Sequence, residues 1–177
     1  MNDRQLSLTE YAVLGLLVER PTHGFAMSKE LAMNGPLGRV LTVRRPLVYR
    51  ALDRLVALAF AEPIHTEPGN AGPKRVIHRA TPAGRRRLKR WLGQPVQHVR
   101  DMRIDFQLKL SLLERLGRSQ LELILAQRVA LDPTLAALDW ARTDAPDHVE
   151  LWRRHNAAAA ETYLNHLERM FRGNEVS

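Results

Sequence analysis

The chain has 177 residues, 45% of them hydrophobic, with no cysteine and a net charge of +8. The lack of cysteine excludes disulfides and thiolate chemistry, and no apolar run reaches the ~20 residues of a membrane-spanning helix. The polar start contains no signal-peptide core, so we expect a cytoplasmic, helix-rich protein of one large domain or two small ones.

The charge is unevenly distributed along the chain. Residues 1–90 hold 16 Lys and Arg against 7 Asp and Glu, a net +9, whereas residues 91–177 hold 11 against 12, a net −1. A basic half joined to a neutral half predicts that the first half meets a polyanion. Nucleic acid is the leading candidate. An anionic membrane surface is the weaker one, since no basic amphipathic helix with a strong apolar face stands out.

Three helices are expected first. The sequence SLTE, Ser7–Glu10, is a capping box that starts a mostly apolar helix, and Pro21 ends that helix. A second helix is predicted from Phe25 to Met33. The third lies in TVRRPLVYRALDRLVALAF, residues 42–60, where Pro46 fits the first helical turn.

A β-hairpin and a fourth helix follow. The β-prone runs AEPIHTE and KRVIHRA flank the turn sequence PGNAGP, which predicts a hairpin. The sequence TPAG then starts a helix, with Thr81 as N-cap and Pro82 at its first position. Three helices, a hairpin and a helix is the order of a winged helix–turn–helix. We therefore predict that residues 1–94 form a winged-helix DNA-binding domain within a mostly α-helical protein.

The third helix has the two faces of a recognition helix. Val48, Ala51, Leu52 and Leu55 recur at helical spacing, while arginines gather at the N-terminal end. A recognition helix anchors one face in its own domain and lays the other in a major groove. A solvated helix face is the alternative for each arginine taken alone. The residues predicted to contact DNA are Arg44, Arg45, Tyr49 and Arg50 of this helix, and Lys74, Arg75 and Arg79 of the wing.

The segments LTEYAVLGLLVERPTHGF, VYRALDRL, TPAGRRRLKRWL and FQLKLSLLERL resemble the PadR family of bacterial transcriptional regulators. The resemblance covers at least residues 6–116 and implies a homodimeric repressor with an N-terminal winged helix and a C-terminal dimerisation region. It places Tyr49 and Arg50 at the family's DNA-facing tyrosine and its neighbour. Ala59 stands where the family usually has glycine, which argues against a left-handed C-cap there.

The C-terminal half, residues 95–177, is the predicted helical dimerisation domain. Its last helix is expected from about Pro146 to Phe171 and would span roughly 39 Å at 1.5 Å per residue. A small domain cannot cover such a length by itself, and the apolar residues of the helix recur at near-heptad spacing. The predicted dimer seam consists of Val149, Trp152, Asn156, Ala159, Tyr163, Leu167 and Met170.

Two tryptophans suggest where an effector binds. Trp91 closes the helix after the wing and Trp152 lies in the seam, so both could line a pocket between the DNA-binding and dimerisation parts. The family resemblance implies a small apolar or aromatic effector, and ordinary packing is the alternative for both residues. No cofactor or metal site is expected.

An enzyme is not expected, because no phosphate loop, nucleophile elbow or supported carboxylate pair is found. We predict a homodimeric repressor of nearby genes that binds a palindromic operator in double-stranded DNA. The alternative is a winged-helix dimer that acts mainly as a protein-binding or ligand-sequestering module. A steep salt dependence of DNA affinity distinguishes the two.

Overall fold

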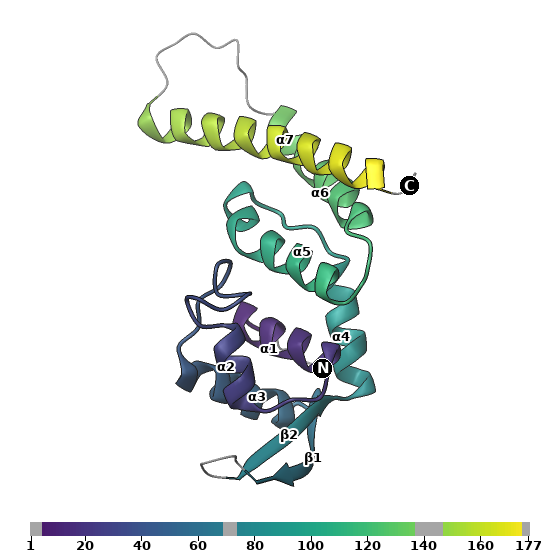
Figure 1. The fold of residues 1–177 in the computed structure, drawn as a ribbon. Helices are drawn as coiled ribbons and strands as arrows, with labels where there is room; N and C mark the ends of the chain where they lie inside the picture. Colours follow the sequence, from purple (N-terminus) through teal and green to yellow (C-terminus); the bar gives the residue numbers. More distant parts are fainter. Residues whose placement is uncertain (1–4, 69–73, 137–146, 175–177) are drawn as a thin grey trace.

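The structure is a computed structural model and describes residues 5–68, 74–136 and 147–174. The N-terminal elements are α1 (Leu8–Glu19), α2 (Gly24–Glu30), α3 (Arg45–Ala57), β1 (Ala61–Glu67), β2 (Arg75–Ala80) and α4 (Pro82–Leu92). The 3-10 helix η1 (Val99–Arg103) and the helices α5 (Asp105–Arg115), α6 (Leu121–Ala136) and α7 (His148–Asn174) follow. The predicted fold class, mostly helical with a winged helix–turn–helix at the N-terminus, is confirmed (Figure 1).

Local signals set several helix starts as expected. Ser7 Oγ accepts a hydrogen bond from Glu10 N–H (3.3 Å), and Glu10 Oε2 accepts one from Ser7 N–H (2.6 Å), so the capping box is complete. Thr81 Oγ1 accepts from Gly84 N–H (3.1 Å) at the start of α4, directly before Pro82. Both caps satisfy backbone donors that have no partner inside the helix.

Two helix boundaries differ from the prediction. Helix α2 ends at Glu30 rather than Met33, because the chain turns back and Leu37 N–H donates to Glu30 O (3.1 Å). Helix α3 begins at Arg45, as expected with Pro46 in its first turn, but it ends at Ala57, before the end of the predicted stretch of residues 42–60. Thr42 does not cap it, since its hydroxyl donates to Gly38 O (2.8 Å) in the preceding loop.

The turn after α3 contains a left-handed residue that is not glycine. Ala59 has a φ of 57°, its N–H donates to Val56 O (2.9 Å), and Phe60 N–H donates to Leu55 O (2.8 Å). These two bonds form a Schellman C-cap, and Thr81 Oγ1 also donates to Ala59 O (2.7 Å). The expectation against a left-handed cap is therefore wrong. The hydrogen bonds of the turn impose it, and Ala59 bears steric strain that glycine would avoid.

Helix α1 lies at the centre of the core. Its residues 10–17 are all buried, because α3, α4, α5 and β2 pack around it. At Gly15 a Cβ atom would come within 2.5 Å of Leu112 Cδ2, so the bare glycine lets α5 approach α1 closely. Helix α5 therefore shares the core of the winged helix, although it lies beyond the predicted boundary at residue 94, and that boundary stays a prediction.

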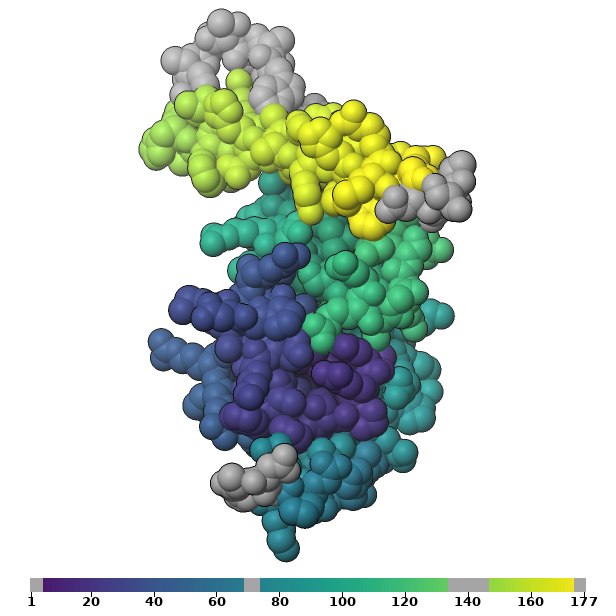
Figure 2. Space-filling model, viewed as in Figure 1, coloured from purple at the N-terminus to yellow at the C-terminus, as the bar shows by residue number. Residues whose placement is uncertain are grey.

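Helices α6 and α7 form a layer on the opposite side of α5 from the wing (Figure 1). Helix α7 runs across the molecule as one long outer helix, which Figure 2 shows at the surface. Its inward side buries Ala157, Ala160, Leu164 and Leu167. In the part of the chain that the structure describes, no helix is both long and apolar enough to cross a bilayer.

Candidate nucleic-acid interface

Helix α3 separates an anchoring face from an exposed face. Val48, Ala51, Leu52 and Leu55 are buried, as predicted from their spacing. Arg44, Arg45 and Arg50 are exposed, and Tyr49 keeps 36% of its surface accessible. A duplex can therefore reach these side chains without any change in the packing of the domain.

Not every arginine of α3 is available to DNA. Arg54 Nε lies 3.1 Å from Glu10 Oε1, and the carboxylate of Glu10 is 5% exposed. This ion pair joins α3 to the capping box of α1. Charge on α3 is thus divided between a structural cation in the last turn of the helix and exposed cations toward its N-terminal end.

The N-terminus of α3 is open to an anion. Arg44 is its N-cap residue and makes no side-chain capping bond. The N-terminal end of a helix carries partial positive charge and unpaired backbone N–H groups, both of which favour a phosphate. Arg44 and Arg45 add full positive charges at the same end.

The wing is fixed to the body of the domain through its second strand. Thr22 N–H donates to His78 O (3.0 Å), and His78 N–H donates to Thr22 O (2.8 Å). Lys74 is exposed and Arg75 half-buried, close to the tip of the wing. Arg79 differs from them because its Nε donates to Glu62 Oε1 across the hairpin (2.7 Å). Its charge is therefore partly compensated within the wing.

A groove of about 590 Å³ separates the recognition helix from the wing. Arg45 and Tyr49 line it from α3, Lys74 and Arg75 from the wing, and Phe25 from α2. The groove thus brings together four of the residues predicted to contact DNA. Arg44, Arg50 and Arg79 are not among the residues that line it.

His23 caps α2 at one end of this groove. Its Nδ1 accepts a hydrogen bond from Ala26 N–H (3.2 Å), which requires the neutral ring. Partial burial and the nearby charge of Arg75 lower the pKa of His23, and Glu67 opposes them. His23 therefore stabilises the start of α2 as its N-cap.

Helix α7 carries two apolar stripes. The buried stripe consists of Ala157, Ala160, Leu164 and Leu167. An exposed stripe beside it contains Val149 (47% exposed), Trp152 (69%), Ala159 and Met170 (54%). Of the remaining residues of the predicted seam, Asn156 and Tyr163 are half-buried, and Tyr163 shares a hydrogen bond with Gln107 (3.1 Å). Leu167 belongs to the buried stripe of its own chain.

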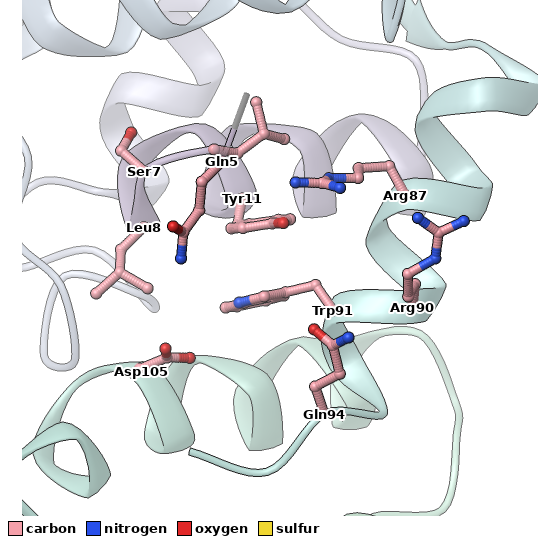
Figure 3. Close-up of a pocket in the computed structure, with 10 residues that line it drawn as sticks. Gln5, Ser7, Leu8, Tyr11, Arg87, Arg90, Trp91, Gln94 and Asp105 are labelled. Carbon is pink, nitrogen blue, oxygen red and sulfur yellow. The ribbon is translucent and has the colours of Figure 1, made fainter. Parts of the chain in front are cut away.

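Trp91 and Trp152 lie in different surroundings. Trp91 is 7% exposed and stacks on Tyr11, with ring centroids 4.1 Å apart. It borders a cavity of about 430 Å³ between the N-terminal segment, α1, α4 and the start of α5 (Figure 3). Arg87, Arg90, Gln94 and Asp105 also line this cavity, whereas Trp152 does not. The basic sequence of α4 gives no sign that two of its arginines, Arg87 and Arg90, border a cavity.

Behind the cavity lies a buried lysine. Lys109 is 2% exposed, and its Nζ donates to Gln94 O (2.8 Å), lies 3.1 Å from Asp105 Oδ1 and stands over the Trp91 ring (4.8 Å). Burial lowers the pKa of Lys109, and Asp105 opposes that effect. The sequence gives no sign of this burial, because the pattern of α5 predicts only an apolar stripe.

An ion-pair network connects α5 to the helix–turn–helix. Arg115 donates to Glu19 of α1 (2.7 Å) and to Glu30 of α2 (3.0 Å). Burial opposes the charge of Arg115, but the two carboxylates outweigh it and raise the pKa of the guanidinium. The three residues lie far apart in the sequence, so no local pattern could have revealed this contact.

Comparison with known protein families identifies the N-terminal segment of the chain. Residues 13–90 match the sequence model of the transcriptional regulator PadR-like family. The N-terminal part of the chain belongs to the PadR-like family. The match spans the PadR-like domain from α1 to near the end of α4, and helices α5 to α7 lie outside it. No curated protein matches the chain.

Several solved structures are similar to the chain at low sequence identity. Bacillus subtilis PadR in complex with operator DNA is 19% identical with a TM-score of 0.49, and the match covers 94% of this chain and 99% of that chain. Its complex with p-coumaric acid is 17% identical with a TM-score of 0.45, covering 93% and 99%. The smu.1604c protein of Streptococcus mutans UA159 is 16% identical with a TM-score of 0.44, covering 91% and 96%.

Proposed function

We propose that this PadR-like regulator is a homodimeric repressor that binds a palindromic operator through α3 and the wing of each subunit. One observation carries the proposal. Arg45 of the recognition helix and Lys74 and Arg75 of the wing line the same groove, next to a helix N-terminus without a side-chain cap. Such a surface suits a polyanion that enters between a helix and a hairpin.

The dimer is proposed to form through α7. Two recognition helices of a symmetric dimer must lie about 34–36 Å apart to enter successive major grooves. Val149, Trp152 and Met170 are large apolar residues left exposed on one helix, and exposed apolar stripes mark surfaces that bind a partner. A second copy of the chain can cover this stripe and fix the separation of the winged domains.

Selection of DNA by the full-length protein tests the proposal. Binding to a pool of random duplexes should enrich a palindrome, and the logarithm of its affinity should fall steeply with the logarithm of salt concentration. A protein-binding or ligand-sequestering module would enrich no sequence and show little salt dependence. Transcription in vitro from a promoter that overlaps the selected palindrome then tests repression.

Single substitutions test which residues read the sequence. Arg45→Ala or Arg50→Ala should reduce discrimination against random DNA by roughly 1–3 kcal/mol if either residue contacts a guanine edge. Lys74→Ala should weaken binding to all sequences alike and lower the salt slope by about one. Arg79→Ala should have a smaller effect than Lys74→Ala, because Glu62 already compensates its charge. Equal effects of all four substitutions on selected and random DNA would contradict these roles.

The effector is proposed to bind in the cavity beside Trp91. Its volume of about 430 Å³ lies in the range of small-molecule sites. The stacked rings of Tyr11 and Trp91 offer an aromatic wall, and Arg87 and Arg90 extend from α4 at its side (Figure 3). These features favour a small aromatic molecule that carries an acidic group over a wholly apolar one. Trp152 does not line this cavity, so its proposed role is in the dimer.

Tryptophan fluorescence tests the effector site. Benzoate should quench the emission and weaken DNA binding, whereas neutral benzamide should do so less. Arg90→Ala should reduce the response to benzoate, and Lys89→Ala, an exposed neighbour that does not line the cavity, should not. If benzoate acts equally on the natural chain and on Arg90→Ala, the proposed site is wrong.

A further inference from the structure

Phe25 lies at a meeting point of cations from three separate elements. Lys29 of α2 stands 4.8 Å from the centroid of its ring. Arg45 of α3 stands 5.1 Å away and Arg75 of β2 stands 5.9 Å away. Phe25 is half-buried and lines the groove between the recognition helix and the wing. These contacts place an aromatic ring under the two arginines that the proposed function assigns to DNA.

The contacts have a physical reason. The face of an aromatic ring carries negative potential and attracts a cation within about 6 Å, and the flat guanidinium of arginine also stacks on such a face. An exposed arginine would otherwise sample many rotamers and lose that freedom on binding DNA. A ring that already holds the side chain reduces the entropy lost on binding.

Arg45 is held from a second side. Its guanidinium stands 5.6 Å from the ring of Tyr49, so it lies close to two aromatic residues at once. Tyr49 is in turn seated over Gly24, where a Cβ atom would come within 2.6 Å of Tyr49 Cε1. The first turn of α2 therefore supports the recognition helix twice, through the bare backbone of Gly24 and through the ring of Phe25.

We propose that Phe25 is a positioning residue for DNA recognition, and that it orients Arg45 of the recognition helix and Arg75 of the wing as one unit. The proposal rests on the proposed function. Phe25 need not touch DNA itself. Its role is to present one arginine to the major groove and the other to the backbone in a fixed relation. The two arginines should consequently contribute to binding in a coupled manner.

The unliganded protein gives the first test, which does not depend on DNA. The Nε–Hε resonances of Arg45 and Arg75, assigned through Arg45→Lys and Arg75→Lys, should be displaced by the ring current of Phe25. Phe25→Leu should return both resonances toward ordinary positions, and Phe25→Tyr should keep them displaced. Phe60→Leu, the same change at another half-buried phenylalanine, should leave them unchanged. Resonances that do not respond to Phe25→Leu would overturn the proposal.

DNA binding gives the second test, with a selected palindrome and the random pool as probes. Phe25→Leu should weaken binding to the palindrome about 5- to 30-fold, the combined effect of two weak cation–ring contacts. Phe25→Tyr should restore it, and Phe60→Leu should change it less than twofold. A double-mutant cycle of Arg45→Ala and Arg75→Ala should show coupling in the natural chain and additive effects in the Phe25→Leu background.

The possible failures are distinguishable. If Arg45→Ala weakens binding at least tenfold while a folded Phe25→Leu protein binds normally, Phe25 has no positioning role and the proposed function survives. If neither Arg45→Ala nor Arg75→Ala affects binding, the proposed DNA interface fails, and the positioning role fails with it. If the Phe25→Leu protein does not fold, Phe25→Tyr and the double-mutant cycle of Arg45→Ala and Arg75→Ala in the natural chain still test the proposal. Additive effects of the two arginine substitutions in that cycle would overturn it.

Discussion

Helices α1 and α7 are both rich in apolar residues, yet only α1 is covered on all sides by its own chain. Leu14 and Leu17 of α1 are completely buried, whereas Trp152 of α7 is 69% exposed. Helix α1 has 12 residues and fits among four neighbouring elements. Helix α7 has 27 residues and would extend about 40 Å, which is more than α6 and η1 can cover.

This difference separates two roles of an apolar helix. Apolar residues on all sides of a short helix indicate a core, because every face must be buried. Apolar residues that remain exposed in a stripe on a long helix indicate a surface for a partner. Along α7 both situations occur, since its buried stripe meets its own chain and the stripe of Val149, Trp152, Ala159 and Met170 does not.

Substitution of Trp152 tests the exposed stripe of α7 and should have the largest effect, on the stability of the proposed dimer. Trp152→Asp places a charge in the exposed stripe and should cost at least about 2 kcal/mol of dimer stability, as for other central aromatic residues of interfaces. The dissociation constant of the dimer should rise at least about 30-fold, measured by sedimentation equilibrium. Affinity for a palindrome should fall in parallel, because two half-sites are no longer bound together.

A matched control is available on the same helix. Thr162 is exposed and lies outside both apolar stripes, so Thr162→Asp should leave the dimer intact. A fragment of residues 1–118, which keeps α5 and its contacts with α1, should remain folded as a monomer. A Trp152→Asp protein that retains the same mass in solution as a dimeric natural chain would show that the stripe is not the interface.

Removal of the Arg115 side chain tests whether α5 is joined to the helix–turn–helix around α1. Arg115→Ala should reduce the free energy of unfolding by about 2 kcal/mol, because it leaves Glu19 and Glu30 facing each other at a partly buried site without their cation. Chemical denaturation measures this change. Arg118→Ala, at an exposed arginine nearby, should change stability by less than about 0.5 kcal/mol. Equal effects of the two substitutions would mean that α5 is not joined to the helix–turn–helix through this network.

Features that depend on neighbouring residues could be predicted from the sequence. The capping box of Ser7 and Glu10, the cap at Thr81 and the buried face of α3 each follow from spacings of three or four residues. The order of helices and hairpin follows from these signals together. The winged helix was therefore predictable, and with it the general location of the cationic surface.

Features that depend on tertiary contacts could not be predicted. Helix α2 ends early because the following loop returns to Glu30. The contacts of Phe25 involve α2, α3 and β2 at once. The near-heptad pattern of α7 contains two adjacent apolar stripes. A one-dimensional pattern cannot tell which stripe packs against the same chain, and the structure places Leu167 in the one that does.

Ala59 marks local strain in the covered part of the molecule. Its φ of 57° lies in the left-handed region, where an L-residue with a Cβ atom is strained by about 1–2 kcal/mol. Ala59→Gly should relieve this strain, and the larger entropy of glycine in the unfolded chain offsets part of the gain. We expect a net stabilisation of about 0.5–1 kcal/mol, measured by thermal unfolding. Ala57→Gly, in the last turn of α3, should instead destabilise by up to about 1 kcal/mol.

Substitution of His23 should have the smallest effect on stability, and this effect depends on pH. Its neutral ring accepts the capping bond from Ala26 N–H, and partial burial together with Arg75 lowers its pKa in the folded protein. Between that lowered pKa and the ordinary value near 6.5, the unfolded chain binds more protons than the folded one. The contribution of the cap is therefore fully present above pH 6.5 and is lost as the pH falls below it.

Replacement by asparagine isolates this contribution, because asparagine caps a helix without titrating. Thermal unfolding of His23→Asn should show a shallower loss of stability than the natural chain as the pH falls below about 6.5. The difference should lie near the lower end of the about 0.5–2 kcal/mol that a capping side chain contributes, since solvent screens a half-exposed ring. His98 precedes η1 without a side-chain capping bond, so His98→Gln should keep the natural pH dependence. If His23→Asn also keeps the natural pH dependence of stability, the charge state of His23 does not control the start of α2. The segment that carries Phe25 into the groove is then held by its other contacts alone.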